Sequence, residues 1–193
     1  SMTIKLKDNI PAFNDIQNHW AREEALFVGA RNLFAGIDNV SFGPDMTMTR
    51  GMLVTVLGRL GNIDPGEFTE SRFRDVDANA YYAPYIAWAK QAGIVNGTGD
   101  NRFAPDEPVT REQLAKMLVN YVALVQLTLQ TTMESDGFAD HENISNYARE
   151  AIKIMHQAGI INGREDNRVD PQNSATRAEV AAMLARLIRN VMQ

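Results

Sequence analysis

Three arginines have a type and a position suited to binding an anion. Arg50, Arg111 and Arg177 each follow a threonine and open a run with helical periodicity. A cation in the first turn of a helix faces the positive end of the helix dipole, which costs a few tenths to about 1 kcal/mol unless an anion compensates. Each arginine is therefore expected to pair with a carboxylate of the fold, to bind an anionic ligand, or to do both. The candidate carboxylates are those of Asp15, Asp75 and Asp140.

The threonines before these arginines have a simpler explanation. A threonine ahead of an apolar-periodic run is a helix N-cap, and Thr110 with Gln113 or Thr176 with Glu179 completes a capping box. Capping accounts for the threonine and for the Glu or Gln, but it does not account for the arginine between them.

The same residues recur in three blocks of the chain, which indicates repeated structural units. The arginines are separated by 61 and then 66 residues, and a glycine precedes each threonine by 13 residues. Each block also opens with a Phe-x-Asp segment, so the recurring aspartates and glycines are Asp15, Asp75, Asp140, Gly36, Gly97 and Gly163. These patterns divide one domain, residues 1–193, into repeats at 13–60, 73–121 and 138–189.

Each block is predicted to form two helices joined by a long ordered loop. In the third block Val180, Met183, Leu184 and Leu187 follow the threonine at the spacing of one buried helical face. The earlier helices are shorter and end at residues suited to a left-handed C-terminal cap, namely Asn32, Gly93 and Gly159. We expect the stretch 119–129 to extend the second helix of the second block.

One helix pair of this size cannot bury its apolar stripe alone, so the three pairs should pack on one another. The sequence therefore predicts an all-α fold with one core and three similar outer grooves. The candidate groove aromatics are Trp20, Tyr81 and Tyr147, at the start of the first helix of each block. Such a ring can be a packing contact, but beside an arginine and a carboxylate it is typical of a saccharide site.

Composition excludes several other functions. With 24 acidic and 19 basic residues the net charge is -5, which argues against nucleic-acid binding. The absence of cysteine excludes disulfides and thiolate metal sites, and the three histidines do not recur at equivalent positions, so we expect no metal and no cofactor.

No apolar run approaches the roughly 18 residues of a membrane span, so no membrane insertion is expected, and residues 1–12 contain no stretch of signal-peptide type. No nucleophile elbow or repeated Ser/His cluster supports catalysis.

The order of these motifs resembles the S-layer homology (SLH) module, in three copies that cover nearly the whole chain. The match is most specific in the second block, with Gly93-Ile94-Val95-Asn96-Gly97 and Thr110-Arg111-Glu112-Gln113, and in the third, with Thr176-Arg177-Ala178-Glu179. The first block departs from the pattern, because Thr49-Arg50-Gly51-Met52 lacks the Glu of the capping box.

The resemblance implies three helix-loop-helix repeats around a central helical bundle with pseudo-threefold symmetry. It also implies an extracellular, non-catalytic module, monomeric within a larger surface protein, that anchors this protein to the cell wall or S-layer of a bacterium. Grooves between repeats would bind secondary cell-wall polysaccharide, often pyruvylated. By position, Arg50, Arg111 and Arg177 would meet the ketal carboxylate, while the recurring aspartates, aromatics and glycines would shape the grooves.

Three alternatives remain open from the residues themselves. The chain could recognise peptidoglycan directly, or it could be a protein-interaction or self-assembly scaffold of a surface layer, whose apolar stripes bury partner helices. An enzyme acting on wall glycans is the third alternative, although no pair of carboxylates can be selected for it from the linear sequence.

Overall fold

The computed structural model describes residues 12–69, 72–134 and 137–192. Residues 1–11 lie outside these ranges, and they make up nearly all of the segment 1–12 that is predicted to contain no signal-peptide stretch. Within them the chain forms six α-helices joined by loops and short 3-10 turns, without a β-strand. The helices are α1 (Arg22–Ala30), α2 (Arg50–Leu60), α3 (Ala83–Gln91), α4 (Arg111–Leu124), α5 (Arg149–Gln157) and α6 (Arg177–Val191). The prediction of an all-α fold is confirmed.

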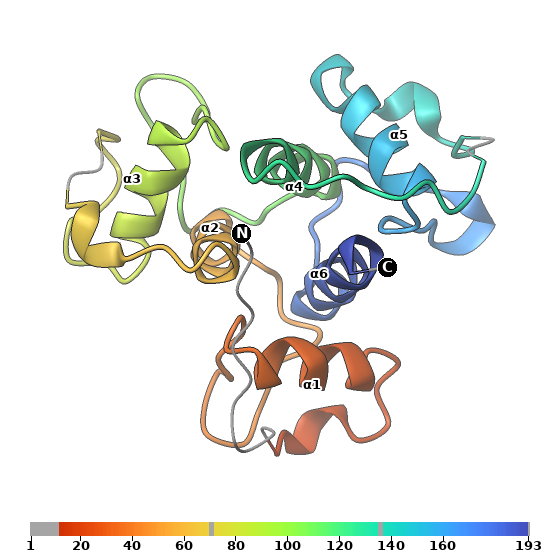
Figure 1. Cartoon of the computed structure of the whole chain (residues 1–193), viewed down its shortest axis with the longest axis horizontal. Coiled ribbons are helices and arrows are strands. Elements are labelled where there is room, and N and C mark those ends of the chain that lie inside the picture. Colours follow the sequence, from red (N-terminus) through yellow and green to blue (C-terminus); the bar gives the residue numbers. More distant parts are fainter. Residues whose placement is uncertain (1–11, 70–71, 135–136, 193) are drawn as a thin grey trace.

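The three arginine-bearing helices lie at the centre of the molecule. Figure 1 shows α2, α4 and α6 nearly end-on, with α1, α3 and α5 arranged outside them. Each outer helix packs against a central helix of another repeat: α3 packs on α2, α5 on α4, and α1 on α6. The first repeat therefore also contacts the last one. Pseudo-threefold symmetry between the repeats stays a prediction.

The central helices build the core from the apolar stripe that the sequence shows. Leu53, Leu57, Leu114, Leu184 and Ile188 are fully buried, and each such side chain contributes about 1.5–3 kcal/mol by leaving water. Trp88 on α3 is 7% exposed and belongs to this core. Among the helices of the described ranges, we find none with the length and apolarity that crossing a membrane requires.

Three backbone hydrogen bonds form a closed ring just before the central helices. The amide of Met48 donates to the carbonyl of Ala175, that of Ala175 to Val109, and that of Val109 back to Met48, each at 2.9 Å. These residues precede the N-cap threonines, which have extended backbone conformations. All three repeats are thus joined at the level where the central helices begin.

Local signals placed most helix ends correctly. Thr110 with Gln113 and Thr176 with Glu179 form capping boxes, and the predicted left-handed residues Asn32, Gly93 and Gly159 have φ values of 59°, 75° and 69°.

The extension of α4 through residue 129 is wrong, because the helix ends at Leu124. Gln126 adopts a left-handed φ of 54°, and the amide of Leu127 turns back to the carbonyl of Val122. The following segment is held by Asn190 on α6, whose side chain accepts a hydrogen bond from the amide of Gln130.

Candidate functional site

Each of the three arginines is buried and reaches into a loop of another repeat. Nε of Arg50 donates to the carbonyl of Phe103 at 2.9 Å, and Nε of Arg111 donates to that of Val169 at 2.6 Å. Nε of Arg177 donates to the carbonyl of Phe42 at 2.9 Å. The three side-chain bonds therefore run from the first repeat to the second, from the second to the third, and from the third back to the first.

The same loops compensate the unfavourable position of a cation at a helix start. The amides of Arg50 and Gly51, which begin α2, donate to the carbonyls of Glu107 and Pro105 in the loop that Arg50 contacts. Several carbonyl oxygens thus face this helix end and offset its positive dipole. Burial lowers the pKa of all three guanidiniums below the usual arginine value, although arginine stays charged in proteins. A buried cation of this kind favours further anionic contacts.

The aspartates hold the loops from the opposite side. Asp75 accepts hydrogen bonds from the amides of Phe103 and Ala104, both at 2.8 Å. Asp15 does the same for Phe42 and Gly43, and Asp140 for Val169 and Asp170. Two adjacent amides match the two oxygens of a carboxylate, which explains why the aspartates take this role. In the described ranges they form no ion pair with the three arginines, so these aspartates are not the partners of the arginines; the carboxylate that pairs with Arg111 is Glu179.

Two grooves open beside these arginines. The first, here called the Arg50 groove, has a volume of about 470 Å³. Its walls are formed by Arg50, Ile94, Val95, Asn96, Gly97, Thr98, Gln113, Lys116, Met117, Asn120 and Tyr147. The second, the Arg177 groove, has a volume of about 390 Å³. Its walls are formed by Phe34, Ala35, Gly36, Ile37, Met48, Met52, Thr55, Val56, Arg59, Tyr81 and Arg177.

Each groove takes its predicted residues from all three blocks of the chain. Arg50, Gly97 and Tyr147 come from the first, second and third blocks, and the three meet in one groove. Likewise Arg177, Gly36 and Tyr81 meet in the other. The aspartates line neither groove. They hold the loops that the arginines contact and have no surface of their own in the grooves. A ligand in either groove would contact the assembled module and no isolated repeat.

Gly97 is required by the shape of the Arg50 groove. Its φ is +89°, and a Cβ at this position would lie 2.6 Å from the carbonyl oxygen of Arg102 and 2.7 Å from the ring of Phe73. A side chain would therefore strain the backbone and displace the wall of the groove.

Tyr147 is held in place by a buried carboxylate. Its hydroxyl donates to Glu112 at 3.1 Å, while Glu112 also accepts from the amide and hydroxyl of Ser145 at 3.0 and 2.8 Å. Burial and the nearby Glu112 raise the pKa of Tyr147 to about 12, so the hydroxyl stays protonated and donates. The ring of Tyr147 is nevertheless accessible to a ligand, because the residue is 51% exposed. Tyr147 is thus a fixed aromatic surface beside Arg50.

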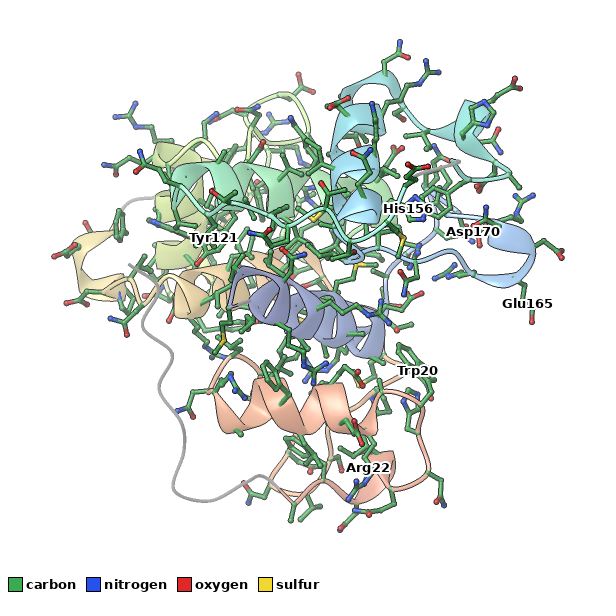
Figure 2. The ribbon with its side chains drawn as sticks, turned by 45° about the vertical axis from the view of Figure 1, so that its right-hand side comes forward. Trp20, Arg22, Tyr121, His156, Glu165 and Asp170 are labelled. Carbon is green, nitrogen blue, oxygen red and sulfur yellow. The ribbon has the colours of Figure 1, made fainter. Side chains whose placement is uncertain are left out.

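The surroundings of Arg111 differ from those of the other two arginines. Nη1 of Arg111 lies 2.9 Å from Glu179, and Nη2 donates to the carbonyl of Asn162 next to Gly163. Glu179 also pairs with Arg164 at 2.8 Å. Trp20, the aromatic of the first block, lies exposed at the edge of the molecule in Figure 2.

Sequence reasoning missed a polar residue that lies ten positions after each threonine and donates to a backbone carbonyl of its own block. Arg59 donates to the carbonyl of Leu33, Asn120 to Ile94, and Arg186 to Ile160. Arg59 and Asn120 line the two grooves. The common offset from the threonine was the available signal, because it places a polar side chain at the same site in each block.

Other features of the described ranges do not coincide with the predicted residues. A hollow of about 740 Å³ beside the start of α5 is lined by His141, Glu142, Arg149 and Lys153 among others, and none of the three arginines lines it. No group of three His, Cys, Asp or Glu side chains in these ranges is arranged to hold a metal ion.

The comparison with known families decides the relationship. A family model described as the S-layer homology domain matches residues 12–51, 72–115 and 137–181. The chain belongs to the S-layer homology family. The matched segments include the three arginines, the three aspartates and the loops that they hold.

The relatives of this S-layer homology chain are surface proteins and enzymes. It is 30% identical over 91% of its length to an amylopullulanase of Thermoanaerobacterium thermosulfurigenes and to the exoglucanase XynX of Acetivibrio thermocellus. It is 27% identical, again over 91% of its length, to an S-layer protein of Bacillus thuringiensis subsp. finitimus. The chain spans 9%, 16% and 21% of these relatives. S-layer homology domains bind cell-wall components, so this chain is a surface-anchoring module associated with the wall or S-layer.

Proposed function

We propose that this chain is a non-catalytic module that binds an anionic, pyruvylated secondary cell-wall polysaccharide in its inter-repeat grooves. It would thereby tether a larger surface protein to the bacterial envelope, acting as a monomer. The observation that carries this proposal is the Arg50 groove, where Arg50, a residue that is 4% exposed, lies on the wall of an open hollow beside the exposed Tyr147.

The chemistry of this groove suits a saccharide with a carboxylate. A guanidinium binds a carboxylate through short, charge-assisted hydrogen bonds, each contributing about 1.5–3 kcal/mol. The apolar face of a pyranose can lie against the ring of Tyr147. Lys116 and Asn120 on the same wall offer further donors for acidic groups and hydroxyls. The groove thus combines one buried cation with one flat apolar surface.

The overall charge of the chain does not oppose this function. Although the net charge is -5, the cations Arg50 and Lys116 are concentrated in one groove, and Arg177 and Arg59 in the other. Two grooves that engage one polymer strengthen retention through effective concentration, without any additional contact. Modest affinity at each site is therefore sufficient for anchoring.

Calorimetric titration tests the proposal. The probes are the methyl glycosides of N-acetylmannosamine with and without the pyruvyl ketal. The intact chain should bind the pyruvylated sugar and show no heat with the unmodified one. Tyr147→Ala should weaken binding in the Arg50 groove about tenfold or more through loss of the stacking surface, whereas Tyr147→Phe should retain most of the binding there.

Two results would contradict the proposal. Equal heats with both sugars would mean that the carboxylate is not recognised. Binding of defined peptidoglycan fragments instead of the pyruvylated sugar would support direct peptidoglycan recognition.

A further inference from the structure

The residue three positions after the threonine differs among the three blocks, and in two of them it touches an arginine of another block. Nη1 of Arg50 donates to the side-chain oxygen of Gln113 at 3.2 Å, and Nη1 of Arg111 donates to Glu179 at 2.9 Å. The third equivalent position is Met52, which lines the groove of Arg177. The same structural position is therefore neutral and polar, negatively charged, or apolar.

This difference changes how fully each arginine is satisfied. All three guanidinium nitrogens of Arg111 donate within the described ranges, to Val169, Glu179 and Asn162. In the same ranges, Arg50 makes no hydrogen bond through Nη2, and Arg177 makes none through Nη1. Both of these side chains are more than nine-tenths buried, and each lines a groove.

The charge of Arg111 is also balanced more fully than the charges of Arg50 and Arg177. Glu179 places a full negative charge against Arg111, with side-chain exposures of 3% for Arg111 and 15% for Glu179. Glu179 also pairs with Arg164, which has a second carboxylate partner in Asp170 at 3.5 Å, so two carboxylates face these two guanidiniums. Opposite charges this close, and this little exposed to solvent, largely cancel each other's field, so the attraction of Arg111 for a further anion is weak. Gln113 accepts a hydrogen bond from Arg50 but cancels none of its charge, and Met52 does neither for Arg177.

We infer that the residue three positions after the threonine decides which arginines are open to an anionic ligand. Arg50 and Arg177 bind a carboxylate from outside, whereas Glu179 serves Arg111 as an internal carboxylate and keeps that site closed. The module then has two anion sites, and its third arginine holds the second and third blocks together. This inference rests on the proposed function for the nature of the ligand, but it can be tested without the polysaccharide.

An exchange of Gln and Glu provides a matched pair of variants. Both residue types complete a capping box, and both side chains here accept from the amide of their own N-cap threonine, at 3.3 Å for Gln113 and 3.0 Å for Glu179. Gln113→Glu should therefore close the Arg50 site, and Glu179→Gln should open the Arg111 site, while the helix starts are retained. An unchanged dispersion of the backbone amide spectrum confirms folding of each variant.

The experiment is an NMR titration of the intact ¹⁵N-labelled chain with sodium pyruvate as a simple carboxylate. The Nε–H signals of the three arginines are followed, since each Nε–H is protected by its bond to a loop carbonyl. In the native chain we expect the signals of Arg50 and Arg177 to shift and that of Arg111 to stay. In Gln113→Glu the shift of Arg50 should disappear, and in Glu179→Gln the signal of Arg111 should begin to shift.

The inference is overturned if all three signals shift alike in the native chain, if none shifts, or if the exchange leaves the pattern unchanged. These outcomes are separate from failure of the proposed function. Suppose that pyruvate shifts the signals of Arg50 and Arg177 but calorimetry detects no binding of the pyruvylated sugar. The two anion sites would then be supported, and the proposed polysaccharide ligand would be contradicted.

Discussion

Nε of Arg177 lies 2.9 Å from the carbonyl oxygen of Phe42, which is 135 positions earlier in the chain. This bond joins the last block to the first and completes the series made by Arg50 with Phe103 and by Arg111 with Val169. The amide of Phe42 is held by Asp15 at 2.8 Å. Each such loop is therefore fixed from two sides, and the grooves depend on the joining of all three blocks.

Replacing Arg177 should destabilise the whole module. Arg177→Met leaves the carbonyls of Phe42 and Ala35 without their donors, which should lower the free energy of unfolding by about 1.5–3 kcal/mol. Equilibrium unfolding in urea measures this change. The control is Arg189→Met, because the Arg189 side chain is 43% exposed, pairs with Glu24 only at 3.7 Å and lies 4.7 Å over the ring of Phe27, so a loss of about 0–1 kcal/mol is expected there. Equal losses for both variants would contradict a structural role of the Arg177 bonds.

Gly97 and Gly99, two positions apart in one loop, distinguish the cost of backbone strain from the cost of close atomic contacts. In Gly97→Ala the new Cβ is placed on a residue with a φ of +89° and lies too close to Arg102 and Phe73. In Gly99→Ala the φ is +109°, but no atom lies within 4 Å of the new Cβ. Gly99→Ala should therefore cost about 1–3 kcal/mol through strain alone, and Gly97→Ala should cost more. Thermal unfolding compares the two variants. A similar loss for both would show that the groove wall adapts to a methyl group.

Asp75 should make the stability of the chain depend on pH in the acidic range. Burial alone would raise the pKa of Asp75, but the hydrogen bonds from Phe103, Ala104 and Arg102 together outweigh it and lower the pKa. The folded chain then binds fewer protons than the unfolded chain, so stability rises with pH in this range. The contribution is complete above the unfolded pKa of about 3.9 and is lost as the pH falls toward the lowered folded value.

Asp75→Asn provides the measurement for this contribution. The variant should be less stable than the native chain at pH 7, and the difference in the midpoint of urea unfolding should shrink as the pH is lowered below 4. A difference that stays constant between pH 7 and pH 3 would contradict the role of the ionised carboxylate.

Tyr121 carries its hydroxyl into the core between the helices. Its side chain points into the helical core (Figure 2) and is fully buried. In the described ranges its hydroxyl has no hydrogen-bond partner, and burial raises the pKa of Tyr121 to about 12. Tyr121→Phe should therefore leave the free energy of unfolding unchanged or raise it by up to about 1 kcal/mol. A loss larger than about 1 kcal/mol in urea unfolding would reveal a partner for the hydroxyl.

The parts of the fold that depend on local sequence were predictable. The capping boxes, the left-handed helix ends and the buried face of α6 follow from residues close together in the chain. The partners of Arg50, Arg111 and Arg177 were not predictable, because they are backbone carbonyls 53, 58 and 135 positions away. A carbonyl is present at every residue, so no residue type marks it.

For the candidate site, too, the residue types were predictable from the sequence, but their long-range partners were not. The recurrence of arginine, glycine and aromatic residues indicated a groove, and the structure brings one residue of each type together in the Arg50 and Arg177 grooves. Which block supplies each residue depends on the packing of α1 on α6, α3 on α2 and α5 on α4, which periodicity does not determine. The binding roles of the twelve predicted residues, the single-domain organisation and the repeat boundaries stay predictions.

The most direct test of anchoring is sedimentation of the intact chain with purified wall sacculi, before and after chemical removal of the polymer that is not peptidoglycan. The account predicts that the chain sediments with native sacculi, that most of it stays in solution with stripped sacculi, and that Tyr147→Ala reduces the sedimented fraction. Equal sedimentation with native and stripped sacculi would contradict it.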